Sequence, residues 1–310
     1  MALSFVKLGF GFDYSLVAYF ADCCLVLVLI TNSSSCVRYM YDLGTKVSHG
    51  GRNLRASEME TALKCIWSCA TACGTRKIGR VVSKFSSYKD TAFFFEGVEG
   101  HVALSIDDGL SRGGSSTSLA GDVLELLQKH NAHCTFFVCS KYLENVQAEA
   151  AALIAAGNEF GNHLEEDKFG YSKLPEEQFE AALQSTTEAI ESVPGAQVRW
   201  FRAPQGVFTS RMFRVTARKG LRHAIGDAYC DDWAISDGKW VAKMLLKQAK
   251  AGSIIIMHMP ERGLREHTLE ALSLLLDGLS SRGLKCLTLS EMESLAAATS
   301  STAAVGVEKI

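Results

Sequence analysis

The sequence predicts an α/β fold, in which parallel strands and helices form a barrel behind an N-terminal extension of poorly defined structure. Two observations carry this prediction. From about residue 101, short apolar runs alternate with segments of helical periodicity, as they do in successive βα units. The chain has 310 residues, 47% of them apolar, which is enough for one large domain and an appendage.

The first expected strand, residues 101–104, is an apolar run that ends in the turn sequence SIDDG at residues 105–109. Further strands are expected at residues 133–138, directly before His163, and at residues 199–201, 253–257 and 285–289. Helices are expected at residues 119–130, 148–156, 176–192, 210–219, 240–250, 265–281 and 291–297. Repeated strand–helix alternation of this kind favours a parallel barrel.

Residues 1–95 differ from the rest of the chain, and we treat them as an N-terminal extension. Their most apolar stretch, near residues 15–31, contains Asp22 and is shorter than the ~20 apolar residues of a spanning helix. It fits an export signal or a membrane anchor, and equally a buried helix or an incorrectly assigned chain start. Secretion or membrane anchoring is therefore favoured over a cytoplasmic location, and membrane association would use this stretch.

The remaining features of the extension indicate structure rather than chemistry. Cys65, Cys69 and Cys73 recur every four residues, which places them on one face of a helix as a packed seam. Residues 74–90 are rich in lysine and arginine, a composition that is typical of a solvated connector. We therefore expect residues 1–95 to be dispensable for chemistry, a functional domain at residues 96–297, and a flexible tail at residues 298–310. The net charge of −2 argues against nucleic acid as a partner.

Polar residues suited to metal binding or proton transfer follow four of the expected strands. Asp107 and Asp108 end the first strand, and His163 with Asp167 follows the third. A histidine and a carboxylate four residues apart can face the same way, and Asp108 completes a His/Asp/Asp ligand set. Three protein ligands leave coordination positions open for water and substrate, as catalytic metal sites require. Arg202 and His258 follow two further strands, and Asp231 with Asp232 lies between them in the chain.

Six segments in this order resemble the polysaccharide deacetylase family, also known as carbohydrate esterase family 4 or the NodB homology domain. The family patterns T-F-D-D-G, A-T-F-F, H-S/T-x-x-H, R-x-P-x-G, D-W and L-x-H correspond to SIDDG (105–109), CTFF (134–137), HLEED (163–167), RAPQG (202–206), DW (232–233) and IMH (256–258). The resemblance covers about two thirds of the chain and implies a distorted (β/α) barrel of the polysaccharide deacetylase type.

The resemblance also implies a role for each matching residue. Asp107 would be the general base and His258 the general acid, oriented by Arg202 and Asp232 respectively. Asp108, His163 and Asp167 would hold one divalent metal. Zinc is the ion usual in this family, with Co²⁺, Mn²⁺ or Ni²⁺ as alternatives. The substrate side would be formed by Gln205, whose backbone N–H would stabilise the oxyanion, and by Trp233 and Ile256, which would line the acetyl pocket.

Two residues depart from the family pattern. Asp167 replaces the second histidine ligand, which adds negative charge and makes a metal other than zinc an alternative. Gln205 replaces an aromatic residue, which removes a sugar-stacking surface but keeps the backbone N–H. The resemblance therefore implies a metal-dependent hydrolase that removes acetyl groups from chitin, chito-oligosaccharide or peptidoglycan. An O-acetyl esterase, an amidohydrolase for another substrate, and a carbohydrate-binding protein without turnover are the alternatives.

Overall fold

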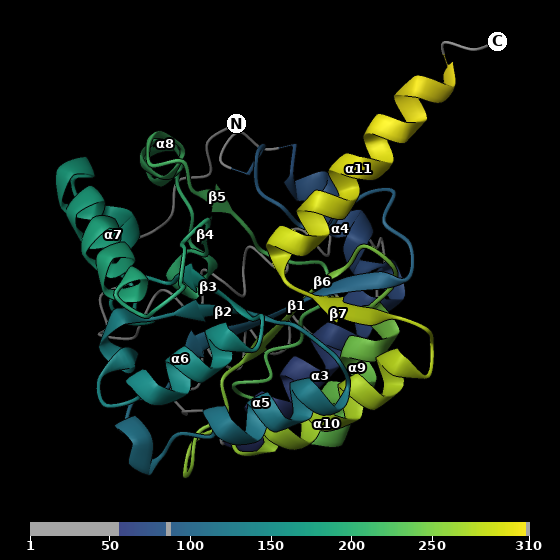
Figure 1. Cartoon of the computed structure of the whole chain (residues 1–310). Coiled ribbons are helices and arrows are strands. Elements are labelled where there is room, and N and C mark those ends of the chain that lie inside the picture. The colour runs from purple at the N-terminus through teal and green to yellow at the C-terminus, as the bar shows by residue number, and fades with distance from the viewer. Residues whose placement is uncertain (1–55, 85–87, 308–310) are drawn as a thin grey trace, which may run out of the picture. The chain divides into compact units, whose positions relative to one another are not determined.

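The computed structural model describes residues 56–84 and 88–307 of the chain (Figure 1). The apolar stretch near residues 15–31, predicted as a signal or an anchor, lies outside these ranges. Residues from Leu54 to Ile310 form one compact unit. Within the described residues, no helix combines the length and the apolar character needed to cross a membrane.

The centre of the unit is a seven-stranded sheet in which every strand pair is parallel. The order along the sheet is β5-β4-β3-β2-β1-β6, and β7 pairs with the beginning of β1. The strands are β1 (His101–Gly109), β2 (Thr135–Val138), β3 (Glu159–Asn162), β4 (Trp200–Phe201), β5 (Arg222–His223), β6 (Ile254–His258) and β7 (Lys285–Leu287). A parallel sheet with helices between its strands confirms the predicted α/β fold class.

Helices flank the sheet (Figure 1). Contacts connect neighbouring helices in the order α3, α9, α10, α5 and α6, while α7 packs on α8 and on β3. Their bounds are α3 (Ala56–Cys73), α4 (Thr75–Val82), α5 (Ala120–Lys129), α6 (Gln147–Ala155), α7 (Glu176–Glu191), α8 (Ser210–Arg218), α9 (Gly238–Gln248), α10 (His267–Ser280) and α11 (Leu289–Val307). Short 3₁₀ turns occupy Gly114–Ser116, Ser140–Leu143, Tyr171–Lys173 and Pro204–Gly206.

The burial of β1, β2 and β6 explains why these strands could be predicted from the sequence. Every residue of β2 is buried, and β1 is buried from its second residue onward. Strands covered on both faces need continuous apolar sequence rather than alternation, and the runs in β1, β2 and β6 have that form. Four cysteines, Cys134, Cys139, Cys230 and Cys286, are buried among these strands and loops, as expected of small core residues.

The basic connector expected at residues 74–90 is not a solvated linker throughout, because residues 75–82 form α4. Arg76 of this helix is buried and pairs with Asp227, with 2.6 Å between Nε and Oδ2. Its guanidinium also donates to the Ala251 carbonyl and to Ser253 Oγ, both at 3.0 Å. A buried charge of this kind needs a partner, and the barrel supplies it. Helices α3 and α4 thus belong to the same compact unit as the barrel.

Two further elements differ from expectation. Helix α11 continues to Val307, so residues 298–307 are helical where a flexible tail was expected. Alanine is the best helix former, and three consecutive alanines lead into this segment. Strand β5 has only two residues, Arg222–His223, and no apolar run in the sequence marked it.

Candidate active site

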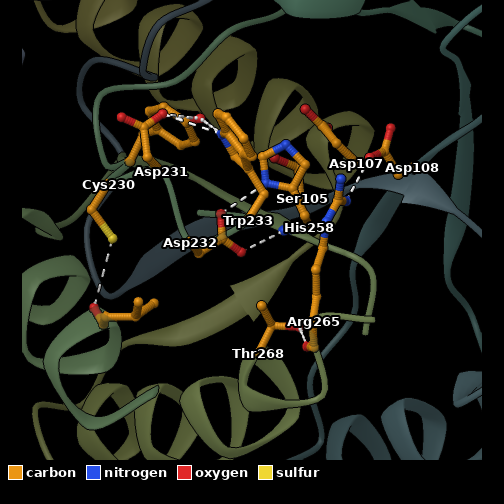
Figure 2. Close-up of polar contacts among 12 residues, drawn as sticks. Ser105, Asp107, Asp108, Cys230, Asp231, Asp232, Trp233, His258, Arg265 and Thr268 are labelled. Carbon is orange, nitrogen blue, oxygen red and sulfur yellow. Dashed lines mark hydrogen bonds and ion pairs between the residues drawn. The ribbon is translucent and has the colours of Figure 1, made fainter. Parts of the chain in front are cut away.

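The predicted catalytic residues lie at the carboxyl ends of adjacent strands. Asp107 of β1 and His258 of β6 are direct partners in the parallel register, so their side chains start from neighbouring backbone positions. Figure 2 shows both at the same edge of the sheet. The edge at the carboxyl ends of parallel strands is where α/β folds place their sites.

Asp107 is held by Arg202, which follows β4. Arg202 Nη1 lies 2.5 Å from Asp107 Oδ1 and 2.9 Å from Ser105 Oγ. The remaining guanidinium nitrogens donate to the backbone carbonyls of Ala224, at 3.0 Å, and Ile225, at 2.7 Å. Arg202 is therefore fixed on every side, and it in turn fixes one oxygen of Asp107.

Asp108, His163 and Asp167 come together as a three-residue cluster. One ligand atom from each lies within 4.8 Å of the others. His163 Nδ1 lies 2.8 Å from the Arg202 carbonyl oxygen. Since a carbonyl only accepts, Nδ1 carries the proton, and the lone pair of Nε2 faces the two carboxylates. Nε2 lies 3.8 Å from Asp108 Oδ1 and 3.7 Å from Asp167 Oδ1.

The cluster fits a divalent cation. Asp108 Oδ1 is a buried oxygen without a hydrogen-bond partner among the described residues, and it faces His163. An unpaired buried carboxylate oxygen is costly unless something binds it. Burial raises the pKa of Asp167, and the neighbouring Asp108 adds to this effect. Two carboxylates around one imidazole nitrogen form an oxygen- and nitrogen-rich site that a cation would satisfy.

Asp108 also has two arginine partners that the sequence did not indicate. Arg112 Nη2 lies 2.8 Å and Arg265 Nη1 2.6 Å from Oδ2, the oxygen that faces away from the cluster. Burial alone would raise the pKa of Asp108, but the positive charges of His258, Arg265 and the other nearby bases lower it well below its usual range. The two arginines therefore keep Asp108 ionised and leave Oδ1 for the cluster.

His258 is paired with Asp232, not with Asp231. Its Nδ1 lies 2.8 Å from Asp232 Oδ1, and its backbone N–H donates to Asp232 Oδ2 at 2.7 Å. Burial lowers the pKa of His258, but the charge and hydrogen bond of Asp232 outweigh burial and raise it to about 9. Asp231 points away from His258, towards the indole of Trp233 (Figure 2).

The predicted substrate-side residues occupy different positions around this edge. Ile256 of β6 is buried, whereas Trp233 is 41% exposed. The backbone N–H of Gln205 donates to Asp167 Oδ1 at 2.9 Å, and its side-chain amide donates to Asp167 Oδ2. The N–H expected to stabilise an oxyanion is thus occupied by Asp167 in this structure. Gln205 has a left-handed backbone (φ 57°), which this pair of hydrogen bonds helps to hold.

Comparison with known proteins agrees with this arrangement. Residues 96–224 match the model of the polysaccharide deacetylase family. A chitooligosaccharide deacetylase from a Bradyrhizobium species is 27% identical over 59% of this chain and 85% of its own length. The peptidoglycan deacetylase PdaC from Bacillus subtilis superposes with a TM-score of 0.56 at 22% identity, covering 64% of this chain and 92% of that one.

A third similar structure is a pseudoenzyme of carbohydrate esterase family 4 from Bacillus anthracis. Its TM-score is 0.57 at 22% identity, over 64% of this chain and 67% of that chain. At this identity the superposition reports the fold and not the activity. Residues 96–224 thus match the polysaccharide deacetylase family, and the chain is similar in sequence and in fold to proteins of carbohydrate esterase family 4.

Proposed function

We propose that this protein is a metal-dependent deacetylase that hydrolyses the N-acetyl groups of a glycan of the chitin, chito-oligosaccharide or peptidoglycan type. One observation carries the proposal. Asp107, oriented by Arg202, and His258, oriented by Asp232, are partners on adjacent strands, and the Asp108–His163–Asp167 cluster begins at the residue after Asp107. A base, an acid and a cation site at one edge are the parts that amide hydrolysis requires.

Asp108, His163 and Asp167 would hold the cation, and zinc is the first candidate. A bound divalent ion would polarise the acetyl carbonyl and make water more acidic. Asp167 adds a second carboxylate to the ligand set, so Co²⁺, Mn²⁺ and Ni²⁺ are also compatible with the donors.

Asp107 would act as the base. Arg202 binds its Oδ1, which leaves Oδ2 to take a proton from the water whose oxygen attacks the acetyl carbon. The fixed guanidinium prevents rotation of the carboxylate, so the accepting oxygen stays aimed at one place.

His258 would act as the acid. With its pKa raised to about 9, it holds a proton at neutral pH, as a general acid must. Nδ1 is bonded to Asp232, so Nε2 would donate its proton to the amide nitrogen as the C–N bond breaks. The products are acetate and the free amine of the sugar.

The substrate side would be formed by Ile256 and Trp233, which would surround the acetyl methyl group. The Gln205 N–H would serve the oxyanion in a state in which it is not bonded to Asp167, whose Oδ1 lies between Gln205 and His163.

The proposal is tested by measuring acetate release from N-acetylated chito-oligosaccharides, from peptidoglycan fragments and from an O-acetylated xylan. We expect zinc-loaded wild-type protein to release acetate from an N-acetylated glycan, and Asp107→Asn to lose activity by ~10²–10⁴-fold with its metal retained. Release from the xylan alone would point to an O-acetyl esterase. Glycan binding without any release would point to a carbohydrate-binding protein and contradict the proposal.

A further inference from the structure

The side chain of Trp67 connects helix α3 to the active-site edge. This residue lies before the matched family region, which begins at residue 96, and outside every motif in the sequence. Its indole Nε1 donates to Asp231 Oδ2 at 2.7 Å, across 164 residues of chain. The barrel segment that receives this bond directly precedes Asp232, the partner of His258.

Asp231 is the centre of a hydrogen-bonded aromatic group. Besides Trp67, its carboxylate accepts from the Tyr229 hydroxyl at 2.6 Å and from Trp233 Nε1 at 3.3 Å. Trp233 Nε1 also lies 3.0 Å from the Tyr229 hydroxyl oxygen. Asp231 is only 3% exposed, so each of these donors replaces water that the buried carboxylate has lost.

The neighbouring residues Asp231 and Asp232 therefore anchor the same segment through different partners. Asp232 binds His258, and Asp231 binds the three aromatic side chains, as Figure 2 shows for Trp233. Asp231 has a left-handed backbone (φ 52°), a conformation that aspartate adopts more readily than most residues.

The aromatic group borders the proposed acid. Trp67 and Tyr229 pack edge to face, with ring centroids 5.1 Å apart and planes at 86°. The ring of Tyr229 also approaches His258, with ring centroids 6.1 Å apart. Trp233 completes the group and is the partner most open to solvent, at 41% exposure.

We propose that Trp67 is a positioning residue that acts through Asp231 to hold Tyr229 and Trp233 as an aromatic wall beside His258, against which a sugar ring of the glycan binds. Aromatic faces suit this task because they offer large, rigid apolar area with few side-chain torsions to immobilise. The proposal rests on the proposed function, and it makes helix α3 part of the substrate site.

The decisive variant is Trp67→Phe, which keeps the aromatic bulk but removes the N–H. One carboxylate oxygen of the buried Asp231 then loses its hydrogen-bond donor, so Tyr229 and Trp233 are held less rigidly. We expect KM for an N-acetylated chito-oligosaccharide to rise roughly tenfold, with kcat within about twofold of wild type. Hydrolysis of 4-nitrophenyl acetate, which has no sugar ring to pack against the wall, should change much less.

A matched control lies one turn earlier on the same helix. Lys64 pairs with Asp237 at 3.0 Å and does not contact Asp231, so Lys64→Met disturbs the attachment of α3 but not the aromatic group. We expect wild-type KM for this variant. Tyr229→Phe removes another donor of the same group, so its effect on KM should be less than multiplicative with that of Trp67→Phe.

Amide hydrogen exchange of residues 227–234, measured in the full chain, separates this proposal from the proposed function. We expect faster exchange there in Trp67→Phe than in wild type or Lys64→Met. Wild-type KM together with wild-type exchange in Trp67→Phe would overturn the proposal, and so would equal changes in the Lys64 control. If wild-type protein releases no acetate, the proposed function and the sugar-binding role fail together, while the exchange rates still decide whether Trp67 positions the segment.

Discussion

Asp167 stands where the family pattern has a second histidine, and this difference changes both the charge and the hydrogen bonding of the cluster. A neutral imidazole adds no charge to a metal site, whereas a carboxylate adds a negative one. Asp167 also accepts two hydrogen bonds from Gln205, whose own position differs from the family pattern. The two departures are therefore in direct contact, which the sequence alone did not reveal.

Replacing Asp167 by alanine should weaken metal binding while leaving the fold intact. The loss should exceed the ~10–100-fold that removal of an outer-sphere partner costs, because a ligand is removed directly. Competition with a chromophoric chelator measures the affinity. Glu166→Ala is the control, since Glu166 pairs only with the surface lysines Lys141 and Lys168 among its described salt bridges. Unchanged affinity in Asp167→Ala would remove Asp167 from the ligand set.

Replacing His258 by alanine should affect amides and esters differently. An amine leaves readily only after protonation, whereas an alkoxide or phenoxide is easier to expel. We expect hydrolysis of the N-acetyl amide to fall by ~10²–10⁴-fold, with a much smaller loss on an activated acetate ester and with metal content unchanged. Equal losses on both substrates, with the fold and metal intact, would leave His258 as a pocket residue rather than the acid.

Replacing Asp232 by asparagine should move the pH dependence. The folded pKa of His258, about 9, lies above its ordinary value of 6.5, so the stabilisation from this pair is complete below pH 6.5 and is lost as pH rises through 9. In Asp232→Asn the opposing effect of burial remains, so the pKa falls. The alkaline limb of kcat/KM should shift to lower pH, because the acid loses its proton earlier. An unshifted limb would show that another group sets it.

The sequence predicted those site residues that directly follow strands. Asp107, Asp108, His163 and His258 each end an apolar run, and parallel strands bring such ends together. Arg112 and Arg265 could not be found in the same way, because both lie in loops without a motif. Arg265 reaches Asp108 across 157 residues of chain, a separation that only tertiary structure closes.

At the scale of elements, the N-terminal helices differ most from the sequence-based expectation. Residues 1–95 contain no family motif, and on that basis we expected them to be dispensable for chemistry. Composition suggested a solvated linker at residues 74–90 because lysine and arginine are usually exposed. The partner that buries Arg76 is Asp227, which lies 151 residues later, so local sequence carried no sign of it.

Breaking this pair should destabilise the protein strongly. Asp227 has a fully buried side chain, and removal of one partner from a buried ion pair typically costs ~3–5 kcal/mol. Arg76→Met should therefore lower the free energy of unfolding by about that amount in urea denaturation. Arg80→Met, one turn later on α4, is the matched control: its pair with Glu96 is exposed and should contribute ~0–1 kcal/mol. Similar losses in both variants would mean that Arg76 contributes no more than a surface arginine.

The elements that were predicted accurately are helices whose ends are marked by local sequence signals. Helices α5, α6, α7 and α8 lie within one or two residues of their expected ends, because their periodicity and their terminal glycine or proline are local signals. Strand β5 was missed because its two residues, Arg222 and His223, are polar and too few to show a period, and its place is set by pairing with β4.

At the scale of the whole molecule, the barrel edge brings together the proposed base, the proposed acid and the candidate cation site, and Trp67 of α3 bonds to Asp231 from outside the matched family region. We propose that a cation held by Asp108, His163 and Asp167 is required for deacetylation. Activity and metal occupancy should then rise together.

The most direct measurement is a titration of chelator-treated protein with zinc, in which acetate release from an N-acetylated chito-oligosaccharide is followed at each addition. We expect no release without metal and a linear rise that breaks at about one zinc ion per chain. The same titration of Asp167→Ala should show no sharp break. Full release from metal-free protein, or metal binding at this site without any release, would contradict the account.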